Sequence, residues 1–219
     1  MGISAFFVLL LQDMRKIAVI ILLYIIPFPG ISQAPKPKSF DAAWFQMFQG
    51  GVVFPVMVSN LFTDHLFVSA RYSYDIRDVF CLNAGYIIRP NVNGDLKVMP
   101  TLGLIADRMT GPAPGLQVNY SSSRWVVTSI NLSMFDIKNH KSLNNVYNWN
   151  EINYIVKDYF RPGISLFEQY YWEQKKLDHF QGVTIFGKIK SVQYLLYAFN
   201  FWDPGKAWFL AGVGYVHCW

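Results

Sequence analysis

Apolar and polar side chains alternate along most of this chain, in segments of about ten residues. In the segment 78–89, Phe80 and Leu82 fall on one face of an extended strand, while Cys81 and Asn83 fall on the other. Strands of this length, with one apolar and one polar face, are typical of transmembrane β-barrels, whose outer face meets lipid. The pattern therefore predicts an all-β fold, an antiparallel transmembrane barrel.

Turn residues divide most of the chain into strand-like segments. The ten predicted from this pattern are 65–74, 78–89, 96–107, 115–123, 124–136, 146–158, 162–174, 181–190, 191–202 and 206–218. The earlier stretch 40–59 is interrupted by Gln49, Gly50 and Gly51, and glycine suits a tight turn because it adopts positive φ freely. Splitting this stretch gives twelve strands. Ten strands, preceded by a periplasmic or lumen-plugging segment, are the alternative.

The connections between these segments differ in length. Those expected to be long are 108–114, 137–145 and 175–180, and those expected to be short are 122–124, 159–161 and 190–191. Bacterial barrels have an even number of strands, short periplasmic turns and longer external loops. We therefore expect the chain to enter and leave the barrel on the periplasmic side.

Two segments follow the alternation less well. Glu168 shares a face with Leu166 and Tyr170, and the segment 146–158 begins with an asparagine-rich stretch. A soluble β-sandwich also alternates, so it remains an alternative fold.

Composition favours the membrane. Hydrophobic residues make up 53% of the chain and aromatic residues 17%, but charged residues only 15%, whereas soluble proteins have about 25%. After the first three dozen residues, no apolar run is long enough for a membrane-spanning helix. Aromatic residues such as Trp125 and Trp208 gather near segment ends, as in the aromatic girdles of membrane barrels.

The amino-terminal region has the three parts of a secretory signal peptide. Arg15 and Lys16 precede an apolar run over 17–28, and Gly30 and Ser32 suit cleavage after Ser32. We therefore predict a signal peptide over 1–32 with its true start at Met14, a short periplasmic lead over 33–39, and a barrel over 40–219. An uncleaved anchor over 6–31 is disfavoured by its central charged residues.

Charge and cysteine content exclude several other classes of protein. The net charge is +5, and the 19 Lys and Arg residues are scattered, so nucleic acid is not an expected partner. Cys81 and Cys218 form no metal-binding or disulfide motif, and neither a metal nor another cofactor is predicted.

The histidines of the chain do not form a recognisable catalytic set with serine and acidic residues. His140 and Ser142 fall in an expected external loop without an evident orienting acid, so no catalytic residue is predicted. His179 beside Asp178 is interpreted as part of a charged external rim. Eight polar residues are expected to face the lumen, where they line a pore or satisfy one another as a polar core. They are Lys97, Asp107, Gln117, Asn119, Glu151, Asn153, Lys188 and Lys190.

The last strand carries a family resemblance. Phe209, Ala211, Val213, Tyr215 and Trp219 fall on one face, which is the predicted lipid side. This arrangement resembles the terminal assembly signal of bacterial outer-membrane barrels, with Gly214, Tyr215 and Trp219 as the signal residues. The stretch 211–215 is similar to the end of small outer-membrane adhesin and virulence barrels, although His217 stands where an aromatic residue is expected.

The resemblance implies recognition by the barrel assembly machinery and does not imply adhesion. Gln33 at the predicted cleavage site and the tyrosine-rich strands also resemble barrels of Bacteroidota. The sequence thus predicts an integral outer-membrane barrel that is a structural or accessory subunit of an envelope complex or a narrow channel. Its expected partners are outer-membrane lipid, the assembly machinery and other envelope proteins. A lipid-modifying barrel enzyme is the alternative.

Overall fold

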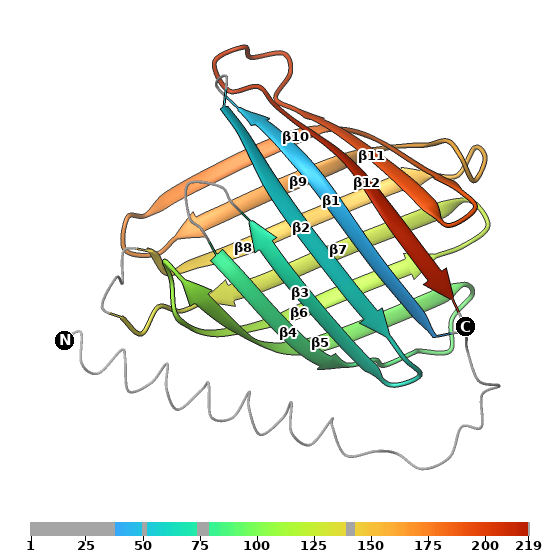
Figure 1. The fold of residues 1–219 in the computed structure, drawn as a ribbon, viewed down its shortest axis with the longest axis horizontal. Helices are drawn as coiled ribbons and strands as arrows, with labels where there is room; N and C mark the ends of the chain where they lie inside the picture. Colours follow the sequence, from blue (N-terminus) through green and yellow to red (C-terminus); the bar gives the residue numbers. More distant parts are fainter. Residues whose placement is uncertain (1–37, 50–51, 74–78, 139–142, 219) are drawn as a thin grey trace. The chain divides into compact units, whose positions relative to one another are not determined.

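The fold is a closed antiparallel barrel. The structure, a computed structural model, describes residues 38–49, 52–73, 79–138 and 143–218, and these residues form twelve strands (Figure 1). The strands are β1 (Ser39–Gln49), β2 (Val52–Phe62), β3 (Leu66–Ser73), β4 (Val79–Tyr86), β5 (Asp95–Asp107), β6 (Gly111–Ser121), β7 (Trp125–Met134), β8 (Asn145–Tyr154), β9 (Arg161–Tyr171), β10 (Lys176–Ile189), β11 (Val192–Phe199) and β12 (Trp208–Cys218). The prediction of twelve strands is confirmed, and a two-sheet soluble sandwich is wrong, because one sheet closes on itself.

The barrel closes where the first strand meets the last. β1 pairs with β12 from Ser39 opposite Cys218 to Gln49 opposite Trp208, and the two strands run side by side in Figure 1. We call the end that carries Ser39 and Cys218 the terminal end and the opposite end the far end. The predicted division of 40–59 is confirmed, because β1 and β2 pair on either side of residues 50–51. The alternative of ten strands is therefore wrong.

Some predictions fall outside the described residues. They are the signal peptide, most of the lead that follows it, and Trp219 of the assembly signal. Gly214 and Tyr215 lie in β12. Within the described residues, no helix has the length and apolarity needed to cross a membrane.

The two faces of the sheet differ as the alternation predicts. Leu102 and Leu104 of β5 are 66% and 65% exposed, whereas Ile105, which points into the barrel, is 2% exposed. On β12, Phe209, Val213 and Tyr215 are likewise exposed. An outer face of large exposed apolar side chains is unfavourable in water and favourable in lipid. The outer face of the barrel is therefore suited to contact with lipid.

Apolar side chains pack in three places inside the barrel. The first cluster is Phe45, Val56, Tyr197, Phe199, Trp208 and Leu210. The second is Val79, Cys81, Ile105, Met109 and Ala113, and the third is Phe62, Phe67, Ile87 and Met99. Several of these side chains are at or near zero exposure, so much of the interior is a packed core.

The long loop predicted over 108–114 is shorter in the structure. Only residues 108–110 join β5 to β6, because β6 begins at Gly111. Pro112 and Pro114 therefore lie inside a strand, opposite Leu104 and Leu102 of β5. Regular pairing between β6 and β7 begins only at Gly115, because Pro112 and Pro114 have no amide hydrogen to donate toward the β7 side. The carbonyl of Pro112 still accepts a hydrogen bond from the Phe135 amide (3.1 Å).

Two other connections also depart from the expected lengths. β10 begins at Lys176, so only residues 172–175 join it to β9, and the predicted long loop over 175–180 is wrong. The longer connection over 87–94 lies at the terminal end, where short turns are expected. The buried side chain of Ile87 anchors this connection against the third cluster, and its amide donates to the carbonyl of His65 (2.7 Å).

One glycine in the closing strand is required by close packing. A Cβ atom on Gly212 would overlap the ring of Phe45, which lies opposite it on β1. We expect Gly212→Ala to destabilise the barrel by about 1–3 kcal/mol, because overpacking forces the ring out of its place. The measurement is the temperature at which the detergent-solubilised protein loses its heat-modifiable gel mobility.

Two variants test the cause of this loss. Phe45→Ala removes the ring that the new Cβ would overlap, so Gly212→Ala should cost less in the Phe45→Ala background than in the unmodified protein. Gly205→Ala is the matched control, because its Cβ would meet only the Asp203 carboxylate, at 3.5 Å. An equal loss in the control would contradict the packing argument.

Candidate functional site in the barrel interior

Seven of the eight predicted lumen residues lie in strands, and one does not. Lys97, Gln117, Asn119, Glu151, Asn153 and Lys188 occupy positions that alternate with the exposed outer residues and therefore face the interior. Asp107 is the last residue of β5, where its φ is 95°, and is exposed at the far end. Lys190 lies in the turn between β10 and β11 with a φ of 56°, so its placement on a lumen-facing strand position is wrong.

Glu151 is the centre of a hydrogen-bond network inside the barrel. Its carboxylate accepts from the Tyr197 hydroxyl (3.0 Å), from the Asn153 amide, and from the Trp149 indole at 3.4 Å. Tyr197 and Asn153 are both buried. The Thr184 hydroxyl extends the network by donating to Asn153 Oδ1 (2.7 Å). The network thereby links β8, β10 and β11 through their inward side chains.

Charged groups of both signs surround the terminal end of the interior. The Asn60 amide donates to Asp41 (2.6 Å), and Lys97 lies 3.3 Å from Asp95. The Gln117 amide donates to Asn119 (3.3 Å), which lies opposite Lys97 on β6. These groups give the terminal end a polar lining with no single dominant charge.

A side-chain contact crosses the barrel from wall to wall. Arg71 of β3 donates from Nη1 to the hydroxyl of Tyr147 of β8 (2.6 Å), and its guanidinium lies 4.9 Å from the centre of the Tyr147 ring. β3 and β8 are far apart in the strand order of the closed barrel. The pair therefore narrows the interior, and we call it the Arg71–Tyr147 bridge.

An aromatic cluster fills the interior beside β8 to β12. Trp149 packs edge-on against Tyr197 and Phe199, with ring centres 5.3 and 5.5 Å away, and Phe199 stacks on Trp208 at 4.2 Å. Phe167 joins the cluster 5.9 Å from Trp149. Because these strands are not all neighbours, the rings fill the space between them and restrict any passage through the barrel.

Polar groups also lie inside the barrel near the far end, on β8 and β9. The Gln169 amide donates to Asn145 Oδ1 (2.7 Å), and the Asn145 amide donates to the carbonyl of Leu143 (2.7 Å). Gln169 and Asn145 are buried. Polar side chains therefore lie on both sides of the Arg71–Tyr147 bridge along the barrel.

The described residues contain no group of three or more His, Cys, Asp or Glu side chains that could hold a metal ion. Cys81 is buried and Cys218 is exposed, and both are free thiols. His140 and Ser142 lie outside the described residues. His179 is not in a loop as predicted. It lies in β10, where its Nδ1 is 3.0 Å from Glu168 of β9.

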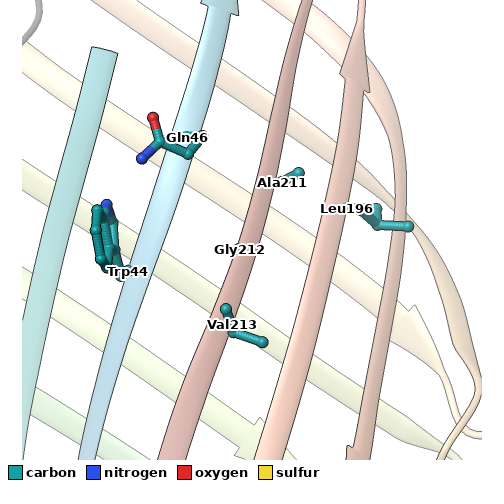
Figure 2. A pocket seen from close by; sticks show the side chains of 6 residues that line it. All are labelled: Trp44, Gln46, Leu196, Ala211, Gly212 and Val213. Atoms are coloured by element: carbon teal, nitrogen blue, oxygen red, sulfur yellow. The ribbon is translucent and has the colours of Figure 1, made fainter. Parts of the chain in front are cut away.

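A shallow depression lies on the outside of the barrel, over the closing strands (Figure 2). It is lined by Trp44, Gln46, Leu196, Ala211, Gly212 and Val213. Its lining is almost entirely apolar, and it lies on the face where lipid is expected. We therefore place the candidate site in the interior.

Two of the solved structures that share this fold are described as porins. One is described as a KdgM porin; it is 14% identical in sequence, with a TM-score of 0.60, and the match covers 80% of this chain and 98% of that one. The other is described as a KdgM porin in complex with disordered oligogalacturonate; it is also 14% identical, with a TM-score of 0.61, and the match covers 81% and 98%. No family model matches the sequence, and no curated protein matches it either.

These likenesses show the fold. The chain has the closed twelve-strand barrel fold of these two porins, and this fold agrees with the predicted outer-membrane location. The resemblance of the chain to barrels of Bacteroidota stays a prediction.

Sequence reasoning missed the residues that narrow the interior. The alternation of Phe67, Ser69 and Arg71 with apolar neighbours could have placed Arg71 on the inner face. It could not have paired Arg71 with Tyr147, because 76 residues separate them.

The Glu151 network predicts a measurable stability effect. Glu151→Ala leaves the Tyr197 hydroxyl and the Asn153 amide without their acceptor, at about 1–3 kcal/mol for each buried donor. Glu151→Gln keeps one acceptor oxygen and should lose less. Urea unfolding of the barrel in lipid vesicles measures the difference, and equal losses for both variants would show that the acceptor is unimportant.

Proposed function

We propose that this chain is a narrow outer-membrane channel for small polar solutes. The observation that carries the proposal is the Arg71–Tyr147 bridge, which narrows an interior that has polar side chains toward both ends. The bridge is a contact between two side chains, so a change of rotamer is enough to break it and widen the passage. The backbone of the barrel does not have to move. The fold shared with porins supports the same conclusion.

The charges of the interior favour neutral solutes. Acidic Asp41 and Glu151 are present together with basic Arg71 and Lys97. A passage for polyanions would need an excess of base along its length, because each unpaired acidic group in the wall repels them. Amide and hydroxyl side chains, by contrast, exchange hydrogen bonds readily with hydroxylated neutral solutes. The oligogalacturonate of the similar porin is therefore not the solute that we propose for this chain.

The second candidate is a structural or accessory subunit of an envelope complex. The observation in its favour is the aromatic cluster of Trp149, Tyr197, Phe199 and Trp208, which occupies part of the interior. A barrel filled in this way would act through its outer surface or its loops. The lipid-modifying enzyme gains no support from the described residues.

The channel proposal predicts a larger passage when the bridge is removed. Arg71→Ala should increase single-channel conductance in planar bilayers several-fold, because the side chain that crosses the interior to Tyr147 is lost. It should also admit larger neutral sugars in a liposome-swelling assay. Tyr147→Phe removes only the hydroxyl that accepts from Arg71, so it should increase conductance less.

Ser69→Ala is the matched control, because Ser69 lies on the same strand and face as Arg71 but is too short to cross the interior. It should conduct like the unmodified protein. If the unmodified protein and Arg71→Ala are both silent while both retain heat-modifiable mobility, the channel proposal fails and the accessory role is favoured.

A further inference from the structure

The outer face of the barrel carries polar side chains where lipid-facing apolar ones are expected. They lie on four consecutive strands, β7 to β10, and we call them the polar band. Its members are Ser129, Asn131, Ser133, Asn148, Asn150, Glu168, His179 and Gln181.

Strand register places these residues side by side. Ser129 lies opposite Asn150, and Asn131 lies opposite Asn148. Asn148 in turn lies opposite Glu168, which lies opposite His179 on β10. The inward neighbours Asn145, Tyr147 and Gln169 are buried, which fixes the band on the outside.

The band lies between the aromatic residues that mark the two membrane surfaces. Trp125 and Tyr154, whose ring centres are 4.9 Å apart, lie on the same face of β7 and β8 at the terminal end. Tyr170 lies on this face of β9 near the far end. Aromatic girdles flank the apolar zone of a barrel. Ser129 and Asn150, near the middle of their strands, therefore lie near the centre of the bilayer.

Such a cluster does not recur elsewhere on the described strands. The outward residues of β5 include the exposed Leu102 and Leu104. The outward residues of β6 that lie opposite Asn131 and Ser129 are Leu116 and Val118, and both are apolar. On β1 and β2, Gln46 and Ser59 are outward-facing polar residues, but their partners across the sheet, Pro55 and Ala42, are apolar. The band is therefore a local feature of one side of the barrel.

Hydrogen bonds within the band satisfy only some of its groups. The Ser129 hydroxyl donates to Asn150 Oδ1 (2.7 Å), and the Asn131 amide donates to Ser129 (3.0 Å). Each asparagine side chain has two N–H donors and one carbonyl acceptor, so these bonds leave N–H groups of Asn150 and the oxygen of Asn131 facing outward. An amide without a hydrogen-bond partner costs several kcal/mol in hydrocarbon. Lipid tails cannot supply partners.

We propose that the polar band is the surface through which two copies of this chain pair in the membrane. Amide and hydroxyl groups both donate and accept, so the band is complementary to itself across a two-fold axis. Glu168 and His179, which pair within the chain at 3.0 Å, extend the polar surface onto β9 and β10. Lipid headgroups lie at the membrane surface, too far from Asn131 and Asn150 to satisfy them.

Cross-linking in the native membrane tests the pairing without altering the band as a whole. Asn148→Cys in a Cys218→Ser background places one outward thiol at the centre of the band, while Cys81 stays buried in the interior. A short bismaleimide added to outer membranes should give a covalent homodimer. Gln46→Cys in the same background is the control on another side of the barrel and should stay monomeric.

A second experiment removes the polar groups. The full chain purified in mild detergent should have the mass of a dimer by native mass spectrometry, and Asn131→Val with Asn148→Val and Asn150→Val should halve that mass. Gln46→Val should leave the dimer unchanged. Heat-modifiable mobility of each variant establishes that the barrel is folded.

Several results would overturn the proposal. They are a monomeric unmodified protein together with no homodimer from Asn148→Cys, cross-links from this position to another protein alone, and equal cross-linking from Gln46→Cys. Lipid bound at the band of a monomer would overturn it as well. None of these results bears on whether the interior conducts, which the bilayer measurements test separately.

Discussion

Backbone hydrogen bonding in a medium without water is the constraint on which this structure depends. Amide and carbonyl groups exposed to lipid tails have no partner there, so a membrane sheet is stable only when every strand has two neighbours. The pairing of β1 with β12 meets this condition by removing both edges. Closure then forces successive side chains to point alternately to lipid and to the interior. The apolar outer face, the Glu151 network and the Arg71–Tyr147 bridge all follow from that alternation.

The same constraint explains which features could be predicted from the sequence. Alternation such as that of Leu102 and Leu104 with Gly103 and Ile105 has a strict period of two, so strands and their faces could be assigned locally. The glycines after Gln49 predicted the point at which β1 and β2 divide. Strand ends were less predictable. Pro112 and Pro114 indicated a loop because proline lacks an amide hydrogen. Both residues nevertheless pair with β5, and the missing hydrogens interrupt only the ladder toward β7.

The contents of the interior could be predicted only in part. Inward positions such as Gln117 and Glu151 follow from local alternation, but their partners come from distant parts of the chain. Tyr197 reaches Glu151 across 46 residues, and Tyr147 reaches Arg71 across 76. The asparagine-rich start of β8 and the position of Glu168 interrupted the alternation, and both belong to the polar band. The positions that broke the alternation are thus polar residues on the outer face of the barrel.

The seam between β1 and β12 has a consequence for how molecules could leave the barrel. The hydrogen-bond ladder between β1 and β12 runs the full length of both strands. On the inner side of the seam, the ring of Phe45 packs against Gly212, where a larger residue would not fit. Separating the two strands would break that ladder inside lipid and uncover the ring at the same time. A sideways exit into the bilayer is therefore strongly opposed at the seam. Transport through this protein would have to run end to end, between two aqueous compartments.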